Sequence, residues 1–183
     1  MRAVSKAVAA ASLLALLLSW GCQPKPKAPA LIDEPVYQSS EGFRFLVPEE
    51  WTMIGRASPP TGRVEKECLL VQYRRSSGDS DAMVEISLMD LPEDADLLEY
   101  LSRPSFSVRR WKSLGQPESI EAGGASGTCY RFSGRAGKSD LAKEVIVFRR
   151  GGRVYFFTVL YSPKDATAVE QVRRSINGLT WTK

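Results

Sequence analysis

The sequence predicts an α+β protein in which an antiparallel β-sheet is flanked by helices as an α/β/α sandwich. Three observations predict this class. Segments with strand-like alternation fill most of the chain after residue 38, a two-glycine turn joins two long apolar segments, and two segments have helical character. Because a sheet that is apolar on both faces needs a cover on each, we expect the two helices to supply those covers.

Residues 1–21 are predicted to be a secretory signal peptide. Arg2 and Lys6 precede an apolar run from Ala7 to Leu18, and the small residue Gly21 ends the segment. A basic start, a short apolar core and a small residue before the cut are typical of export signals. The run is shorter than the ~20 residues that a helix needs to cross a bilayer, so a membrane-spanning anchor is the weaker interpretation.

Gly21-Cys22 resembles the lipobox of bacterial lipoproteins, in which a peptidase cuts before a lipid-modified cysteine. The resemblance implies that Cys22 carries acyl chains such as palmitate and anchors the protein to a membrane. The motif departs at Ser19 and Trp20, positions that bear on the efficiency of processing. Gln23 after the cysteine favours the outer membrane, on its periplasmic side, if the cell is Gram-negative. The alternative is ordinary secretion with a stray cysteine.

Residues 22–37 are predicted to be a tether between the lipid and the folded domain. The segment contains four prolines, which favour an extended and semi-rigid chain. Lys25 and Lys27 would lie near anionic headgroups. A single domain is then expected at residues 38–183, a length that suits one sizeable core.

The domain opens with a predicted strand and continues as a meander. Phe43, Phe45 and Val47 alternate with Arg44 and Leu46, which is the period of a strand. Further strands are expected at residues 52–54, 65–75, 83–91, 118–122 and 127–134.

A first helix is expected between these strands. Pro92–Asp94 has the proline-first, acid-rich character of a helix start, and Leu97 and Leu101 belong to its apolar face. Pro104 would break or restart the helix, and its apolar pattern continues to about Lys112.

The strongest structural prediction is a hairpin of residues 141–150 and 153–162 around Gly151-Gly152, because a two-residue glycine turn suits right-twisted strands. Both of its faces are apolar. The expected cross-strand pairs are Phe148 with Tyr155 and Ile146 with Phe157 on one face, and Val145 with Thr158 and Val147 with Phe156 on the other.

The closing helix is expected to start at an N-cap at Ser162, with Pro163 in its first position, and to end before Gly178. Trp181 lies in a last short segment that would return to the sheet. The predicted apolar stripe of the helix is Ala166, Val169, Val172 and Ile176.

The segment Gly42-Phe-Arg-Phe-Leu-Val-Pro-Glu-Glu-Trp51 resembles the opening motif of the PsbP-like and DcrB-like envelope lipoproteins. The order of elements and the closing Ser-Ile-x-Gly-Leu, residues 175–179, fit the same group. The resemblance covers roughly residues 38–183. It implies the Mog/PsbP fold and an envelope setting, in a group whose relatives bind a photosystem or a Ran-type GTPase, and it carries over no functional residue.

Charge and composition exclude several classes of function. The chain has 25 Lys and Arg against 21 Asp and Glu, and two of the basic residues belong to the predicted signal. The remaining charges are balanced and scattered, so no nucleic-acid partner is expected. Histidine is absent, and with it the usual general base and the commonest metal ligand. We therefore expect no cofactor, no metal and no enzyme activity.

Two small groups of residues remain as candidates. Cys68 and Cys129 could form a disulfide in an oxidising compartment, or both could be buried thiols, and the sequence leaves these alternatives open. Arg149, Arg150 and Arg153 gather at the tip of the predicted hairpin and would suit an acidic partner. The alternative for the arginines is charge that keeps strand ends soluble.

Together these features predict a membrane-anchored, non-enzymatic binding or accessory module of the cell envelope, with a protein partner of unknown identity. One alternative is a histidine-free hydrolase or transferase, which would show a concave pocket with converging Asp or Glu side chains. The other is a purely structural envelope component.

Overall fold

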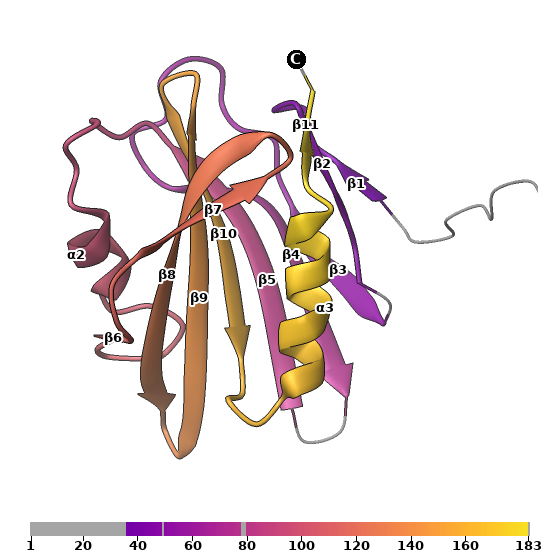
Figure 1. Ribbon diagram of the computed structural model, residues 1–183, viewed down its shortest axis with the longest axis vertical. Coiled ribbons are helices and arrows are strands. Elements are labelled where there is room, and N and C mark those ends of the chain that lie inside the picture. The colour runs from indigo at the N-terminus through magenta and orange to yellow at the C-terminus, as the bar shows by residue number, and fades with distance from the viewer. Residues whose placement is uncertain (1–35, 49, 78–79, 183) are drawn as a thin grey trace, which may run out of the picture. The chain divides into compact units, whose positions relative to one another are not determined.

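The computed structural model describes residues 36–48, 50–77 and 80–182, and the side chains of residues 76–81 are outside the description. The predicted signal peptide, Cys22 and nearly all of the predicted tether lie outside these residues. The described residues form a large sheet, a small sheet and the helices α2 and α3 (Figure 1).

The large sheet is antiparallel, with strand order β3-β4-β5-β10-β9-β8-β6, and β7 also pairs with β8. Its strands confirm most of the predicted ones, with longer central members. Their bounds are β3 (Trp51–Arg56), β4 (Cys68–Ser77), β5 (Ser80–Met89), β6 (Lys112–Ser113), β7 (Glu118–Ala122), β8 (Ala125–Ala136), β9 (Ser139–Arg150) and β10 (Arg153–Tyr161).

The register of the central hairpin is confirmed. Phe148 pairs with Tyr155 and Val145 pairs with Thr158 across the Gly151-Gly152 turn, as the sequence predicts. Both glycines have a positive φ, of 59° and 80°, which the mirror-image hairpin turn requires. Seven consecutive residues of each strand are buried, so each face of the hairpin lies in a core.

One face of the large sheet is covered by α3 (Ala166–Asn177) together with a three-stranded sheet of β1 (Val36–Gln38), β2 (Phe43–Leu46) and β11 (Thr180–Trp181). In Figure 1, α3 lies in front of β4, and the small sheet lies beyond the upper end of this helix. Phe43 joins the two sheets, because its ring lies 5.4 Å from that of Phe157 and 5.3 Å from that of Trp181. The prediction that Trp181 returns to a sheet is correct, but the sheet is the small one.

The opposite face is covered by α2 (Leu97–Ser102) and the irregular segment that follows it. The helix begins later than the predicted start at residues 92–94, the predicted break at Pro104 is confirmed, and the apolar segment after it is not helical. Pro104 prevents continuation, and Phe106 and Ser107 adopt left-handed conformations with φ of 54° and 63°. The predicted α/β/α sandwich is correct in part. Strands dominate the described domain, and on each face of the large sheet the helix is joined by other segments in covering it.

The start of α3 corrects a second prediction. Asp165, and not Ser162, is the N-cap, and its carboxylate accepts a hydrogen bond from Ala168 N. The same carboxylate pairs with Arg75 of β4, at 3.1 Å, in a buried position. The cap therefore also joins the helix to the large sheet.

The disulfide alternative is excluded. β5, β10 and β9 lie between the strands of Cys68 and Cys129, which places the two cysteines about 19 Å apart at ~4.8 Å per strand. A disulfide needs Cα atoms within ~7 Å of each other. Both residues are free thiols, and burial raises the pKa of Cys129 to about 11.

Candidate functional site

An open pocket of about 430 Å³ lies between the large sheet and the segment that contains α2. The sheet supplies its floor from β4, β5, β9 and β10. The end of α2 and residues 103–106 supply one wall. The volume is within the range of ~300–1,000 Å³ that is usual for small-molecule sites.

The floor forms because the side chains on this face change from apolar to polar along the strands. On β10, Val154 and Phe156 belong to the core beneath α2, and the next residue on the same face is Thr158. The strand register places Thr158 between Glu85 of β5 and Val145 of β9. α2 has only six residues, so it covers the apolar part of the face and leaves the polar part open as the pocket floor.

Lys143 of β9 lies at the floor and is only 3% exposed. Its Nζ donates a hydrogen bond to the Leu101 carbonyl oxygen and lies 4.5 Å from the centre of the Trp111 ring and 4.8 Å from that of Phe132. Within the described part of the chain it makes no ion pair. Burial lowers the pKa of Lys143 to about 8, although the charge of Glu67 opposes the change.

Two carboxylates, Glu67 and Glu85, line the same pocket. Glu67 accepts hydrogen bonds from Ser87 Oγ and, at 2.6 Å, from the Tyr100 hydroxyl. Gln72 Nε2 donates to Glu85 Oε2 at 2.8 Å. Burial raises the pKa of Glu85, and the charge of Glu67 raises it further, whereas the bond from Gln72 lowers it. The pocket lining therefore has two cationic groups, Lys143 and Arg103, and two acidic groups, and Arg103 is already paired with Glu99.

The described residues contain no group of three or more Cys, Asp or Glu side chains that could hold a metal ion. Over the same part of the chain, neither helix has the length and apolarity needed to cross a bilayer.

The three arginines of the hairpin tip have separate partners inside the molecule. Arg149 Nη1 donates to the Pro92 carbonyl oxygen at 3.0 Å, and Arg150 Nη2 donates to the Thr182 carbonyl oxygen at 3.0 Å. Arg149 and Arg150 remain exposed at the surface. A docking role for them stays a prediction.

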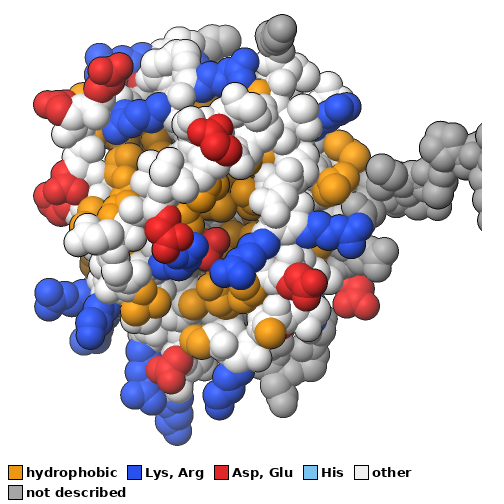
Figure 2. Space-filling model, viewed as in Figure 1, with side chains coloured by type: hydrophobic (Ala, Val, Ile, Leu, Met, Phe, Trp, Pro, Cys, Tyr) orange, Lys and Arg blue, Asp and Glu red, His pale blue; other side chains and the backbone are white. Residues whose placement is uncertain are grey.

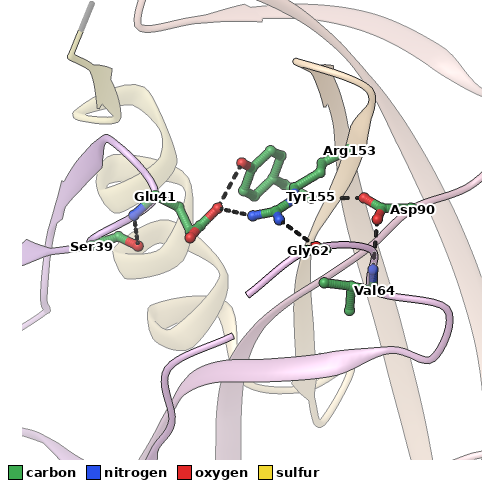
Figure 3. Close-up of polar contacts among 7 residues, drawn as sticks. All are labelled: Ser39, Glu41, Gly62, Val64, Asp90, Arg153 and Tyr155. Atoms are coloured by element: carbon green, nitrogen blue, oxygen red, sulfur yellow. Dashed lines mark hydrogen bonds and ion pairs between the residues drawn. The ribbon is translucent and has the colours of Figure 1, made fainter. Parts of the chain in front are cut away.

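Arg153 lies at the centre of a polar cluster that joins three segments (Figure 3). Its guanidinium contacts Glu41 at 2.6 Å, the Gly62 carbonyl oxygen at 3.0 Å and Asp90 at 3.5 Å. The Tyr155 hydroxyl also donates to Glu41. Burial and the nearby Glu41 carboxylate both raise the pKa of Tyr155. Arg153 thus holds the β1–β2 turn and the loop before β4 against the central hairpin.

Figure 2 shows the face that carries α3, where acidic and basic side chains alternate around an apolar centre. Arg131 pairs there with Glu118 at 2.5 Å and with Glu144 at 3.2 Å. These ion pairs give partners to charged residues of strands β7, β8 and β9. They lie on the side of the large sheet opposite the pocket.

The pocket residues were not among the candidates that the sequence suggested. Lys143 lies within the hairpin strand that was recognised as apolar, and a lysine in such a segment is itself unusual. Period-two alternation also places Lys143 on the face of Val145. The sequence does not reveal that β5 and β10 are neighbours, which is what brings Glu85 to the same pocket.

No protein-family model matches the chain, and no curated protein sequence matches it. Among solved structures, the fold is similar to that of cyanobacterial PsbP (CyanoP) from Synechocystis sp. PCC 6803. The TM-score is 0.56 at 13% identity, over 85% of this chain and 97% of that protein. The described domain has the PsbP-like fold.

Two further structures resemble this PsbP-like domain. LpqN of Mycobacterium tuberculosis has a TM-score of 0.50 at 13% identity, over 82% of this chain and 86% of that protein. The Ran-binding protein Mog1p of Saccharomyces cerevisiae has a TM-score of 0.51 at 12% identity, over 81% of this chain and 95% of that protein. The predicted Mog/PsbP fold is confirmed. Sequence identities this low show a similar fold and do not show a shared function.

Proposed function

We propose that this chain is a lipid-anchored accessory protein of the cell envelope whose PsbP-like domain binds a ligand in the pocket beneath α2. The observation that carries the binding role is the buried ammonium of Lys143 at the floor of an open pocket, which has no ion pair with any described residue. Because a buried charge without a counter-ion is costly, a group of this kind is more readily explained by ligand binding than by stability.

The membrane setting is supported by sequence resemblance at Gly21-Cys22 and by the short apolar run before it. The structure of LpqN, one of the similar folds, is described as that of a protein involved in cell envelope biogenesis, which agrees with an envelope location. An outer-membrane position facing the periplasm, and a protein partner beside the membrane, are further parts of the same proposal.

The anchor is tested by labelling cells with a fatty-acid analogue and comparing the wild-type protein with the Cys22→Ala variant. We expect the label on the wild type and its loss in the variant, since the thiol is the acceptor. A Cys68→Ala variant serves as the control and should keep the label. Equal labelling with and without Cys22, or a soluble mature protein that begins after Cys22, would contradict the anchor.

A protein partner is tested by crosslinking in intact cells followed by mass spectrometry. The same experiment on a variant with Arg149 and Arg150 both changed to Gln asks whether the hairpin tip docks the partner. We expect the crosslinked partner to be reduced in that variant if the exposed guanidinium groups recognise acidic side chains. An unchanged yield would place the partner surface elsewhere on the domain.

A second candidate function is a histidine-free hydrolase or transferase. One observation favours it, because the pocket holds two carboxylates and burial raises the pKa of Glu85, as a general acid requires. Both carboxylates are already engaged by Ser87, Tyr100 and Gln72, an arrangement that also suits fixed binding groups. Turnover of a bound compound, abolished by Glu85→Gln with binding retained, would favour the enzyme over the accessory role.

A further inference from the structure

The pocket lining carries charges of both signs, and its Arg103 is paired with Glu99. Lys143 of β9 supplies a cation, and Glu85 of β5 supplies a carboxylate. β10 lies between these strands, so their backbones are about 10 Å apart at ~4.8 Å per strand. Thr158 of β10 occupies the floor between the two charges and is directly paired with Glu85.

The ammonium of Lys143 has N–H donors to spare. An ammonium group has three N–H donors, and the one hydrogen bond of Nζ among the described residues is to the Leu101 carbonyl oxygen, with the rings of Trp111 and Phe132 nearby. An anionic ligand group would supply an ion-pair partner, which Lys143 lacks among the described residues, and a further hydrogen-bond acceptor.

Glu67 lies close enough to Glu85 and to Lys143 for its charge to act on both groups. The charge of Glu67 contributes to raising the pKa of Glu85, and the Ser87 and Tyr100 hydroxyls fix Glu67 in place. Two neighbouring carboxylates attract a cation that can donate to both. They would repel a second anionic group and so exclude ligands that are negative at both ends.

From this juxtaposition we propose that the pocket binds a small zwitterion, an amino acid or short peptide whose free carboxylate contacts Lys143 and whose ammonium group contacts Glu85 and Glu67. Thr158 lies where the body of the ligand would cross from one charge to the other. The cavity of about 430 Å³ accommodates a molecule of this size. The inference rests on the proposed binding role and names the ligand class of that site.

The experiment uses the full-length protein purified in a mild detergent. Common amino acids and a dipeptide library are tested one at a time, at millimolar concentration, for an increase in the melting temperature. A compound that stabilises the protein is then compared with its N-acetylated form, which has lost the cation, and with its C-terminal amide, which has lost the anion. Trp111 reports binding by fluorescence, because its ring lies 4.5 Å from Lys143 Nζ.

We expect each blocked form to bind at least about tenfold more weakly than the free zwitterion, the loss that removal of one charged hydrogen bond produces. Lys143→Met should lower the affinity for the zwitterion by a similar factor and leave the affinity for the C-terminal amide unchanged. Glu85→Gln should instead remove the discrimination against the N-acetylated form. Lys138→Met, at an exposed lysine of the β8–β9 turn, is the matched control and should bind like the wild type. Circular dichroism of each variant verifies that it is folded.

Three results would overturn the inference: no zwitterion raises the melting temperature, the blocked forms bind as well as the free ones, or Lys143→Met binds the zwitterion unchanged. A pocket that instead prefers simple anions or simple amines would contradict the ligand class and leave the binding role intact. Hydrolysis of a bound dipeptide would contradict the non-enzymatic role. The fatty-acid labelling experiment tests the anchor separately, so these failures can be told apart.

Discussion

At the scale of single residues, Lys143 links the pocket to the pH dependence of stability. Its pKa is about 8 in the folded protein, against 10.5 for a free lysine side chain, because burial disfavours the charged form. Below about pH 8 both states hold the proton, and above about pH 10.5 neither does. Between these values the unfolded chain binds more protons, so the free energy of unfolding rises with pH.

We therefore expect the wild type to gain about 3 kcal/mol relative to Lys143→Met as the pH rises from about 8 to about 10.5. Urea unfolding of both proteins across this range measures the difference. Groups such as Cys129, whose pKa is raised by burial, titrate in both proteins and cancel in the comparison. Parallel curves for the two proteins would show that the amine is solvated in the folded state.

Arg153 is the second residue with a specific expectation. Its ion pair with Glu41 is largely enclosed, with 24% and 14% of the two side chains exposed, whereas the pair of Arg135 and Asp140 is exposed at 68% and 76%. Removing one partner of an enclosed pair leaves the other charge uncompensated. Arg153→Met should lower the free energy of unfolding by about 2–4 kcal/mol.

Arg135→Met is the matched control for this change and should cost less than about 0.5 kcal/mol. Chemical denaturation measures both variants. Equal effects would mean that the cluster around Arg153 contributes no more than a surface ion pair, and the arginine would again be a candidate for docking.

At the scale of elements, α3 depends on its first residue. Asp165 caps the helix and also pairs with Arg75, so one carboxylate satisfies the helix end and a buried guanidinium. Asp165→Ala should reduce the free energy of unfolding by about 3 kcal/mol, because both interactions are lost.

Asp165→Asn keeps a capping oxygen and should fall between the alanine variant and the wild type. Ser162→Ala, at the predicted cap, should cost less than about 0.5 kcal/mol. Thermal or urea unfolding measures all three variants. A larger loss at Ser162 than at Asp165 would contradict the assignment of the cap.

The segment after α2 packs closely against β8 at Gly134, where there is no side chain to prevent the contact. A Cβ on Gly134 would lie 2.6 Å from Val108 and 2.8 Å from Trp111, so the close approach requires glycine. Gly134→Ala should destabilise the domain by about 1–3 kcal/mol through overpacking.

Gly55→Ala is the comparison for Gly134, because its added Cβ would meet Leu69 at an ordinary 3.5 Å. It should change the free energy of unfolding by less than about 0.5 kcal/mol. Trp111 fluorescence during urea unfolding follows both variants. A Gly134→Ala protein as stable as the wild type would mean that the segment can move away from β8 without loss.

At the scale of the whole molecule, local chemistry was predictable and long-range pairing was not. The Gly151-Gly152 turn fixes the hairpin register within the chain itself, so its pairs were predicted correctly. β1 has three residues and β11 has two, and each forms only by pairing with β2. Segments this short carry no period of their own, so the small sheet was missed. The cap of α3 was misplaced because Ser162-Pro163 is as good a local start as Asp165.

The pocket was missed for the same reason. Glu67, Glu85 and Lys143 lie just before β4, on β5 and on β9, and they share one surface only because β10 inserts between β5 and β9. The length of α2 then decides how much of that surface stays open, and Pro104 and two left-handed residues set that length. Neither the strand order nor the end of the helix follows from the apolar pattern.

The cluster around Arg153 would have a mechanical consequence if the proposed N-terminal anchor holds the protein. Tension on the chain before Val36 would reach β1 first, and its three antiparallel pairs with β2 would unzip one after another. Glu41 follows directly in the turn, and its bond to Arg153 ties that turn to the central hairpin. Separation of β1 from β2 would therefore stop at Glu41. A force sufficient to detach β1 would leave the aromatic core packed.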